Sequence, residues 1–169
     1  MFEYFSEAHE LFVYRLGIAR GTSRRAIVTL GTLEQESQRR EVSALMLDLS
    51  EEARLHAAVL EDCFAELKRN VGVPPGHTAE GLDREAHAVL RKTADGIKDL
   101  AVLPLALEVL YEAIAMYEPL TVYAREWISV HLAEQLEKCL VEQLASRNRI
   151  LELMREVFAS AETVEARPQ

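Results

Sequence analysis

The sequence predicts an all-α protein, folded as an antiparallel four-helix bundle with one short extra helix between the second and third long helices. Three observations carry this prediction. Apolar residues recur three or four positions apart along most of the chain, which is the period of an amphipathic helix. The 169 residues include only 7 Gly and 5 Pro, too few for the many turns of an all-β protein. No segment shows the alternation that is typical of a strand.

The elements follow from where the helical period is interrupted. Long helices are expected near residues 6–35, 41–70, 98–127 and 130–159, and a short one near 79–91. The clearest break is the loop at 71–77, rich in Gly and Pro, and another lies near Gly96. Between the third and fourth long helices, the only weak break is around Ser129. Pro104 and Pro119 lie inside the third long helix and should bend it, because each removes a backbone hydrogen bond.

Composition predicts one domain over residues 1–160, followed by a frayed tail at 161–169 that has no apolar period. Apolar residues make up 49% of the chain, enough for a hydrophobic core. Acidic residues outnumber basic ones by 28 to 19, and a net charge of −9 argues against nucleic acid as a partner.

The N-terminal residues and the cysteines bear on where the protein acts. Acidic residues at positions 3, 7 and 10 interrupt the first apolar residues, so no signal peptide is predicted. Apolar stretches such as Leu100–Leu107 are shorter than the ~20 residues that span a bilayer, so no membrane partner is expected. Cys63 and Cys139 have no metal-binding spacing and are expected to be buried, inert thiols. We therefore expect a cytoplasmic protein.

Polar residues fall on the apolar faces of three predicted helices. Glu52 and His56 are four residues apart on the inward face of the second long helix. Gln143 and Arg147 have the same spacing on the fourth, and Ser23 lies on the first. Because an unpaired buried charge is costly, we expect these side chains to form one polar layer in which Arg147 pairs with Glu52. A di-iron site would need a second Glu and His pair, and Arg147 would repel metal ions, so a buried polar network is favoured.

Three segments carry a resemblance to a known family: the run from Glu51 to Phe64, the run Ala79–Leu82, and Tyr117 with its neighbours. In their order and spacing they resemble the YciE/YciF-type branch of the ferritin-like four-helix bundles. The resemblance extends from about Leu11 to Leu90 and again from Asp99 to about Leu153. It implies the ferritin-like fold and a stress-associated bacterial protein that is often dimeric.

The same resemblance implies that the metal site of the family is degenerate here. The family pattern has carboxylates where this chain has the following five residues: Ser23, Leu110, Ala113, Gln143 and Arg147. Only Glu52 and His56 agree with the pattern, and they would be the ligands if any metal binds. We therefore expect no cofactor.

Two functions from different classes remain open. The first is a non-enzymatic bundle, stress-associated or partner-binding, in which a buried polar layer replaces the metal. The alternative is a di-iron or single-metal oxidoreductase with iron held by atypical ligands. Nearby carboxylates for such a site are Glu108, Glu112 and Glu142, although flanking residues that reach solvent are the favoured interpretation.

The start of the chain bears on assembly. It is rich in aromatic residues, namely Phe2, Tyr4, Phe5, Phe12 and Tyr14. These side chains could extend the core of the bundle itself, or they could pack on a second copy or on a protein partner. We expect a homodimer that uses this apolar surplus.

Overall fold

The computed structural model describes residues 4–68, 74 and 76–165. Its five α-helices are α1 (Ala8–Glu36), α2 (Arg40–Glu66), α3 (His77–Leu90), α4 (Lys98–Tyr123) and α5 (Val130–Glu165). A 3-10 turn, Asp95–Ile97, precedes α4, and a π-helical turn, Ala124–Ile128, follows it. No strand occurs in the part of the chain that is described, so the all-α prediction is confirmed.

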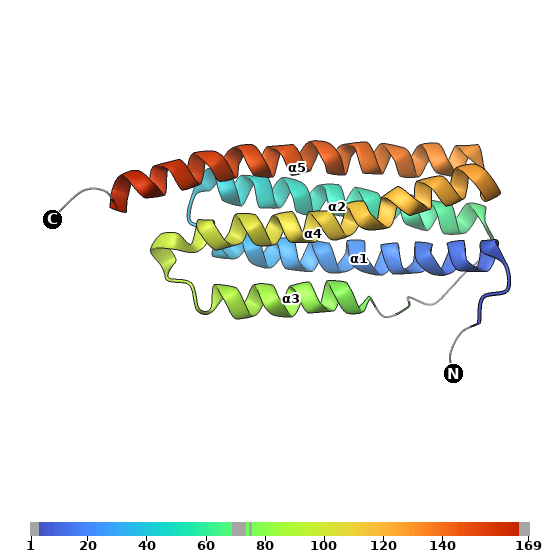
Figure 1. The fold of residues 1–169 in the computed structure, drawn as a ribbon, viewed down its shortest axis with the longest axis horizontal. Helices are drawn as coiled ribbons and strands as arrows, with labels where there is room; N and C mark the ends of the chain where they lie inside the picture. Colours follow the sequence, from blue (N-terminus) through green and yellow to red (C-terminus); the bar gives the residue numbers. More distant parts are fainter. Residues whose placement is uncertain (1–3, 69–73, 75, 166–169) are drawn as a thin grey trace.

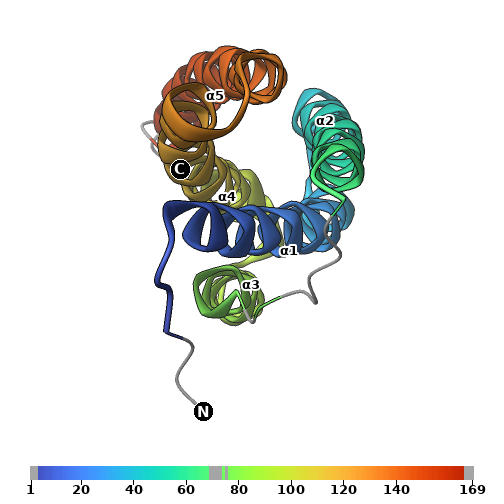
Figure 2. The ribbon, with the colours of Figure 1, turned by 90° about the vertical axis from the view of Figure 1, so that its right-hand side faces the viewer.

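The four long helices run side by side as a bundle, with the short α3 beside them (Figure 1). Around the bundle axis the long helices follow one another in the order α2, α1, α4, α5, and α3 packs on the outer side of α1 and α4 (Figure 2). Two helix pairs, α1 with α2 and α4 with α5, form closely packed hairpins. By contrast, α2 and α5 touch sparingly, although they are also neighbours around the bundle.

The hydrophobic core consists of two clusters that follow each other along the bundle. One contains Leu33, Met46 and Leu103, near the turn between α1 and α2. The other contains Phe12, Leu60 and Leu132, and all six of these side chains are fully buried. Phe12 therefore extends the core of the bundle itself.

The remaining aromatic residues at the start of the chain are placed differently from Phe12. The rings of Phe5 and Tyr14 pack on each other with centroids 4.9 Å apart, and Tyr4 is exposed. Phe2 lies outside the described residues. The aromatic surplus that the sequence suggested is thus partly taken up within this chain.

The helix ends agree with the predicted ones within a few residues, except at the C-terminus. Helix α5 continues to Glu165, so the first five residues of the predicted frayed tail, 161–165, are helical. The physical reason is that Ala and Glu are strong helix formers and extend the helix without an apolar period. Residues 166–169 lie outside the described residues, as do 71–73 and Pro75 of the predicted loop.

Ser129 makes the break between α4 and α5, as predicted. Its backbone is extended, with φ −162° and ψ 131°. Its N–H donates to the carbonyl of Ala124 at 2.8 Å, which closes the π-helical turn. Its hydroxyl oxygen accepts the N–H of Leu132 at 3.4 Å and so caps the first turn of α5.

The turn between α1 and α2 is held by a residue from α4. The carboxylate of Asp99 accepts the backbone N–H of Gln38 at 2.9 Å and that of Arg39 at 3.1 Å. Arg39 is the N-cap residue of α2, and its own side chain makes no capping bond. Next to this contact, Lys98 pairs with Glu36. Asp99 therefore supplies the capping interaction that the local sequence lacks.

Helix α4 with its flanking turns is more apolar than the sequence analysis allowed. The helical segment Asp95–Ile128 is long and apolar enough, by length and composition, to cross a membrane. This corrects the expectation that every apolar stretch of the chain is too short to span a bilayer. Half of its most apolar window is buried in the bundle, and the core helix of a bundle passes the same test of composition.

Candidate functional site

A line of polar side chains joins α2 to α5 near the middle of the bundle. We call it the polar seam, and its members are Asp48, Glu52, His56, Glu142, Gln143, Ser146 and Arg149. Three of the five predicted polar-layer residues, Glu52, His56 and Gln143, belong to it.

His56 is the most deeply buried member of the polar seam, with 1% of its surface exposed. Its Nε2 lies 2.8 Å from Oε2 of Glu142, and its Nδ1 lies 2.8 Å from Nε2 of Gln143. Because an ionised carboxylate can only accept, the Nε2 atom carries the hydrogen. In the neutral ring Nδ1 is then an acceptor, and the side-chain amide of Gln143 donates to it. The ring of Tyr117 packs edge-on against His56, with centroids 5.9 Å apart.

Glu52 is held by two donors from α5. The hydroxyl of Ser146 donates to its Oε2 at 2.5 Å, and Nη1 of Arg149 donates to its Oε1 at 2.8 Å. Arg149 also donates to the carboxylate of Asp48 at 2.6 Å. The Arg149 guanidinium thus bridges two carboxylates that lie one helical turn apart on α2.

The predicted pairing of Arg147 with Glu52 is wrong. Arg147 is half-buried, and its guanidinium donates to the side chain of the adjacent Asn148 at 3.1 Å. The physical reason is the register of α5, whose buried face contains Leu132, Leu136, Cys139, Gln143, Ser146 and Ile150. Arg147 follows the buried Ser146 by one position and is therefore rotated about 100° away from that face.

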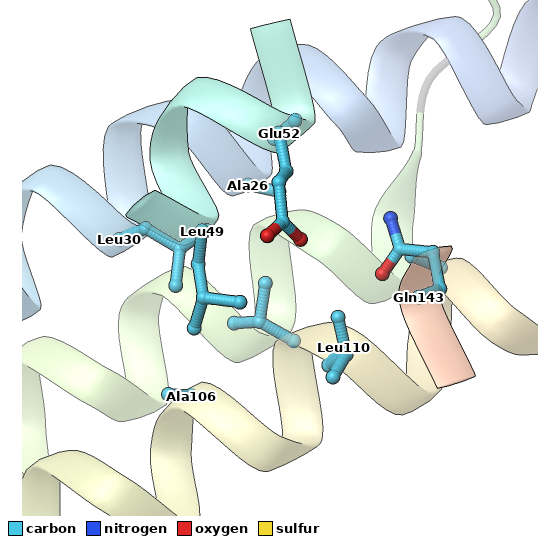
Figure 3. A pocket seen from close by; sticks show the side chains of 10 residues that line it. Ala26, Leu30, Leu49, Glu52, Ala106, Leu110 and Gln143 are labelled. Carbon is cyan, nitrogen blue, oxygen red and sulfur yellow. The ribbon is translucent and has the colours of Figure 1, made fainter. Parts of the chain in front are cut away.

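Two positions of the degenerate metal site, Leu110 and Ala113, line a small cavity between α1, α2, α4 and α5. Glu52 and Gln143 line the same cavity, and in Figure 3 both side chains point into it above Leu110. Its remaining walls are apolar side chains from α1, α2 and α4, among them Leu49. Four residues that the sequence analysis named therefore line one cavity: Glu52, Leu110, Ala113 and Gln143.

Ser23 is buried in α1 but lies outside the polar seam. It is beside the hydroxyl of Tyr117 in the neighbouring α4. Burial raises the pKa of the Tyr117 phenol above its ordinary value, and Ser23 opposes part of that rise. The phenol stays protonated at any physiological pH.

The alternative carboxylates are spread over different surroundings. Glu142 belongs to the polar seam through His56. Glu112 is partly buried on α4, and burial raises the pKa of its carboxyl from 4.5 to about 6. Glu108 is exposed, and burial together with the charge of Glu85 raises its pKa as well. The three carboxylates do not form a cluster with His56: the residues that are described contain no group of three or more His, Cys, Asp or Glu side chains placed to hold one ion.

The polar seam does not fit the di-iron centre of a ferritin-like bundle. Both nitrogens of His56 and both oxygens of Glu52 already bond to protein groups. Leu110 and Ala113 offer no ligand atom, and the Arg149 cation touches Glu52. Two iron ions need carboxylates from all four helices and a second His, whereas the carboxylates of the polar seam come from α2 and α5 alone and His56 is its one histidine.

Both cysteines are buried near this region, as expected. Burial raises the pKa of the Cys63 thiol to about 12 and that of Cys139 to about 12. Both therefore stay neutral and unreactive at physiological pH. The Cys63 thiol donates to the side-chain oxygen of Gln135 at 3.7 Å, a further polar contact between α2 and α5.

The sequence analysis did not identify three members of the polar seam: Ser146, Arg149 and Asp48. Ser146 follows Gln143 by three positions on the buried face of α5, so the alternation of three and four residues that starts at Leu132 contains the signal for it. Arg149 and Asp48 are exposed residues whose side chains reach the polar seam from its rim. No periodicity argument finds such residues.

An antiparallel bundle of four long helices, with polar residues at mid-length on facing helices, defines the chain as a ferritin-like helical bundle. A family described as "domain of unknown function (DUF892)" matches residues 7–162, and the chain belongs to this family. No curated protein matches the chain significantly.

Solved structures with a similar fold agree with this assignment. The stress protein YciF of E. coli is 21% identical, with a TM-score of 0.81 over 89% of this chain and 96% of that one. YcfI from Rhodopseudomonas palustris is 20% identical, with a TM-score of 0.81 over 87% and 97%. A Xanthomonas campestris protein is 16% identical, with a TM-score of 0.76 over 94% and 99%. The resemblance to YciE/YciF-type bundles is thus confirmed for the fold.

Proposed function

We propose that this chain is a non-enzymatic member of its family, a stress-associated bundle that acts through its surface. In this proposal the polar seam replaces the metal centre and holds α2 against α5. The observation that carries the proposal is that Glu52 and His56 bond to α5 side chains through all four of their ligand atoms. A metal ion would have to displace Ser146, Gln143 and the Arg149 cation from them.

The association with stress rests on similarity. YciF of E. coli, which shares the fold, is described as a stress protein. Its role comes to this chain as part of the proposal, together with the cytoplasmic location that the composition suggested.

Action through the surface includes self-association as a homodimer, or binding of a protein partner. Large apolar side chains are exposed on several helices, including Leu47 and Leu55 of α2, Val122 of α4 and Val141 of α5. Trp127 is 61% exposed in the π-helical turn beside Val122. Exposed aromatic residues of this size are enriched in protein interfaces. Sedimentation velocity at high protein concentration should show a dimer, and a strict monomer would remove this part of the proposal.

Metal analysis of untagged protein, produced in iron-supplemented medium, tests the loss of the metal centre. We expect iron and other transition metals at well below one ion per chain, and no change in Tm on adding a chelator. The matched control is the double variant Glu52→Gln, His56→Gln. Iron near one or two ions per chain that is lost in this variant would contradict the proposal and favour the iron-dependent oxidoreductase.

A further inference from the structure

The small cavity beside the polar seam has a volume of about 20 Å³, measured as the space open to the centre of a water molecule. This is enough for about one water molecule, since roughly 10–15 Å³ on the same measure holds one. The lining is apolar except for Glu52 and Gln143, whose side chains both point into the cavity (Figure 3).

Gln143 brings an acceptor to this cavity that no protein group satisfies. The residue is 6% exposed, and its side-chain oxygen accepts no hydrogen bond from any described residue. The cause is its bond to His56, which fixes the amide orientation. The amide nitrogen of Gln143 lies 2.8 Å from Nδ1 of His56 and donates to it. The oxygen of Gln143 is then left facing the cavity.

The other polar group in the cavity is also an acceptor. The two oxygens of Glu52 take one donor each, from Ser146 and from Arg149, and each keeps a second lone pair. Two acceptors that converge in an apolar space exclude an anion. A metal cation would need more oxygen ligands than two and would lie close to the Arg149 cation.

We propose that the cavity is a binding site for a single water molecule, which donates one O–H to the side-chain oxygen of Gln143 and the other to the carboxylate of Glu52. The two donors of water match the two acceptors, and the site offers it two polar partners, the smallest number that holds a buried water. The volume of about 20 Å³ leaves no room for a second water, so the site holds one.

The bound water joins Glu52 to the rest of the polar seam in one chain of hydrogen bonds. The chain runs from Glu52 through the water to Gln143, then to His56 and Glu142. Glu142 is half-exposed and lines an open groove of about 430 Å³ between α2 and α5. The bonds from Gln143 to His56 and from His56 to Glu142 are direct, whereas the oxygen of Gln143 and the carboxylate of Glu52 are both acceptors and are linked only through the donors of the water.

Oxygen-17 magnetic relaxation dispersion, which counts long-lived internal waters, tests the proposal on the intact protein. Gln143→Met keeps the side-chain volume and removes the acceptor, so it should contain one long-lived water fewer than the wild type. Gln135→Met is the matched control, since Gln135 lies on the same helix but outside the cavity, and its count should equal that of the wild type. An unchanged count in Gln143→Met would overturn the proposal.

A second readout keeps the test valid if Gln143→Met does not fold. In the wild-type protein, nuclear Overhauser effects should connect a bound water to the methyl groups of Leu110 and Ala113, which line the cavity. Absence of these signals, or a metal ion found in the same sample at stoichiometric amount, would overturn the water site.

Discussion

Replacing His56 by leucine tests whether the polar seam acts as one unit. Leucine fills most of the space of the imidazole but bonds to neither Glu142 nor Gln143. The amide of Gln143, 6% exposed, is then stranded, which costs about 1–3 kcal/mol, and each lost hydrogen bond adds about 1 kcal/mol. Glu142 contributes little, because its side chain is 44% exposed and returns to water. His56→Leu should therefore destabilise the fold by about 2–4 kcal/mol.

The double variant His56→Leu, Gln143→Leu separates this explanation from simple loss of packing. With both polar partners gone, no buried amide remains unsatisfied, so its cost should fall about 1–2 kcal/mol below the sum of the single variants. Urea unfolding followed by circular dichroism gives these free energies. Glu142→Gln, the exposed control, should cost less than about 1 kcal/mol. Strictly additive effects of the two leucine substitutions would refute the reasoning.

Three further outcomes follow from the structure. Arg149→Ala should lower the free energy of unfolding by about 0.5–1.5 kcal/mol, and Arg147→Ala by less than about 0.5 kcal/mol, because of these two only Arg149 contacts Glu52. Equal effects of the two variants in urea unfolding would contradict this. Asp99→Ala should cost about 2–3 kcal/mol, because two backbone N–H groups lose their acceptor, and hydrogen exchange should quicken at the start of α2 but not at its end. Burial raises the pKa of Glu112 from 4.5 to about 6, so the folded state binds this proton more tightly and loses stability as pH rises through that window. Glu112→Gln should therefore stabilise the protein at pH 7–8, by less than about 1 kcal/mol because the side chain is partly exposed, and should not stabilise it below about pH 4.5. A stabilisation in thermal melts that does not depend on pH would contradict the raised pKa of Glu112.

Most of the fold could be predicted because the helical period of the apolar residues is long and uninterrupted. The positions of Glu52, His56 and Gln143 could be predicted for the same reason, since each follows a run of buried apolar residues at helical spacing. Arg147 could not be placed, because α5 has apolar residues on both flanks of its buried face. A buried face drawn through Leu140 leads to Arg147, and one drawn through Cys139 leads to Ser146. Both Leu140 and Cys139 are apolar, although only Cys139 is fully buried, so the sequence does not distinguish the two faces. A shift of one position turns a side chain by about 100°, enough to exchange Ser146 for Arg147.

The capping of α2 by Asp99 has a consequence for the order in which the chain can become structured. The acceptor for the N–H groups of Gln38 and Arg39, which lead into α2, comes from a residue 60 positions later than Arg39. A ribosome makes the chain from its N-terminus, so the α1–α2 hairpin emerges before its cap exists. The turn between the two helices stays open to water until Asp99 arrives, and the N-terminal half of the bundle gains its final turn only when the C-terminal half begins to fold against it.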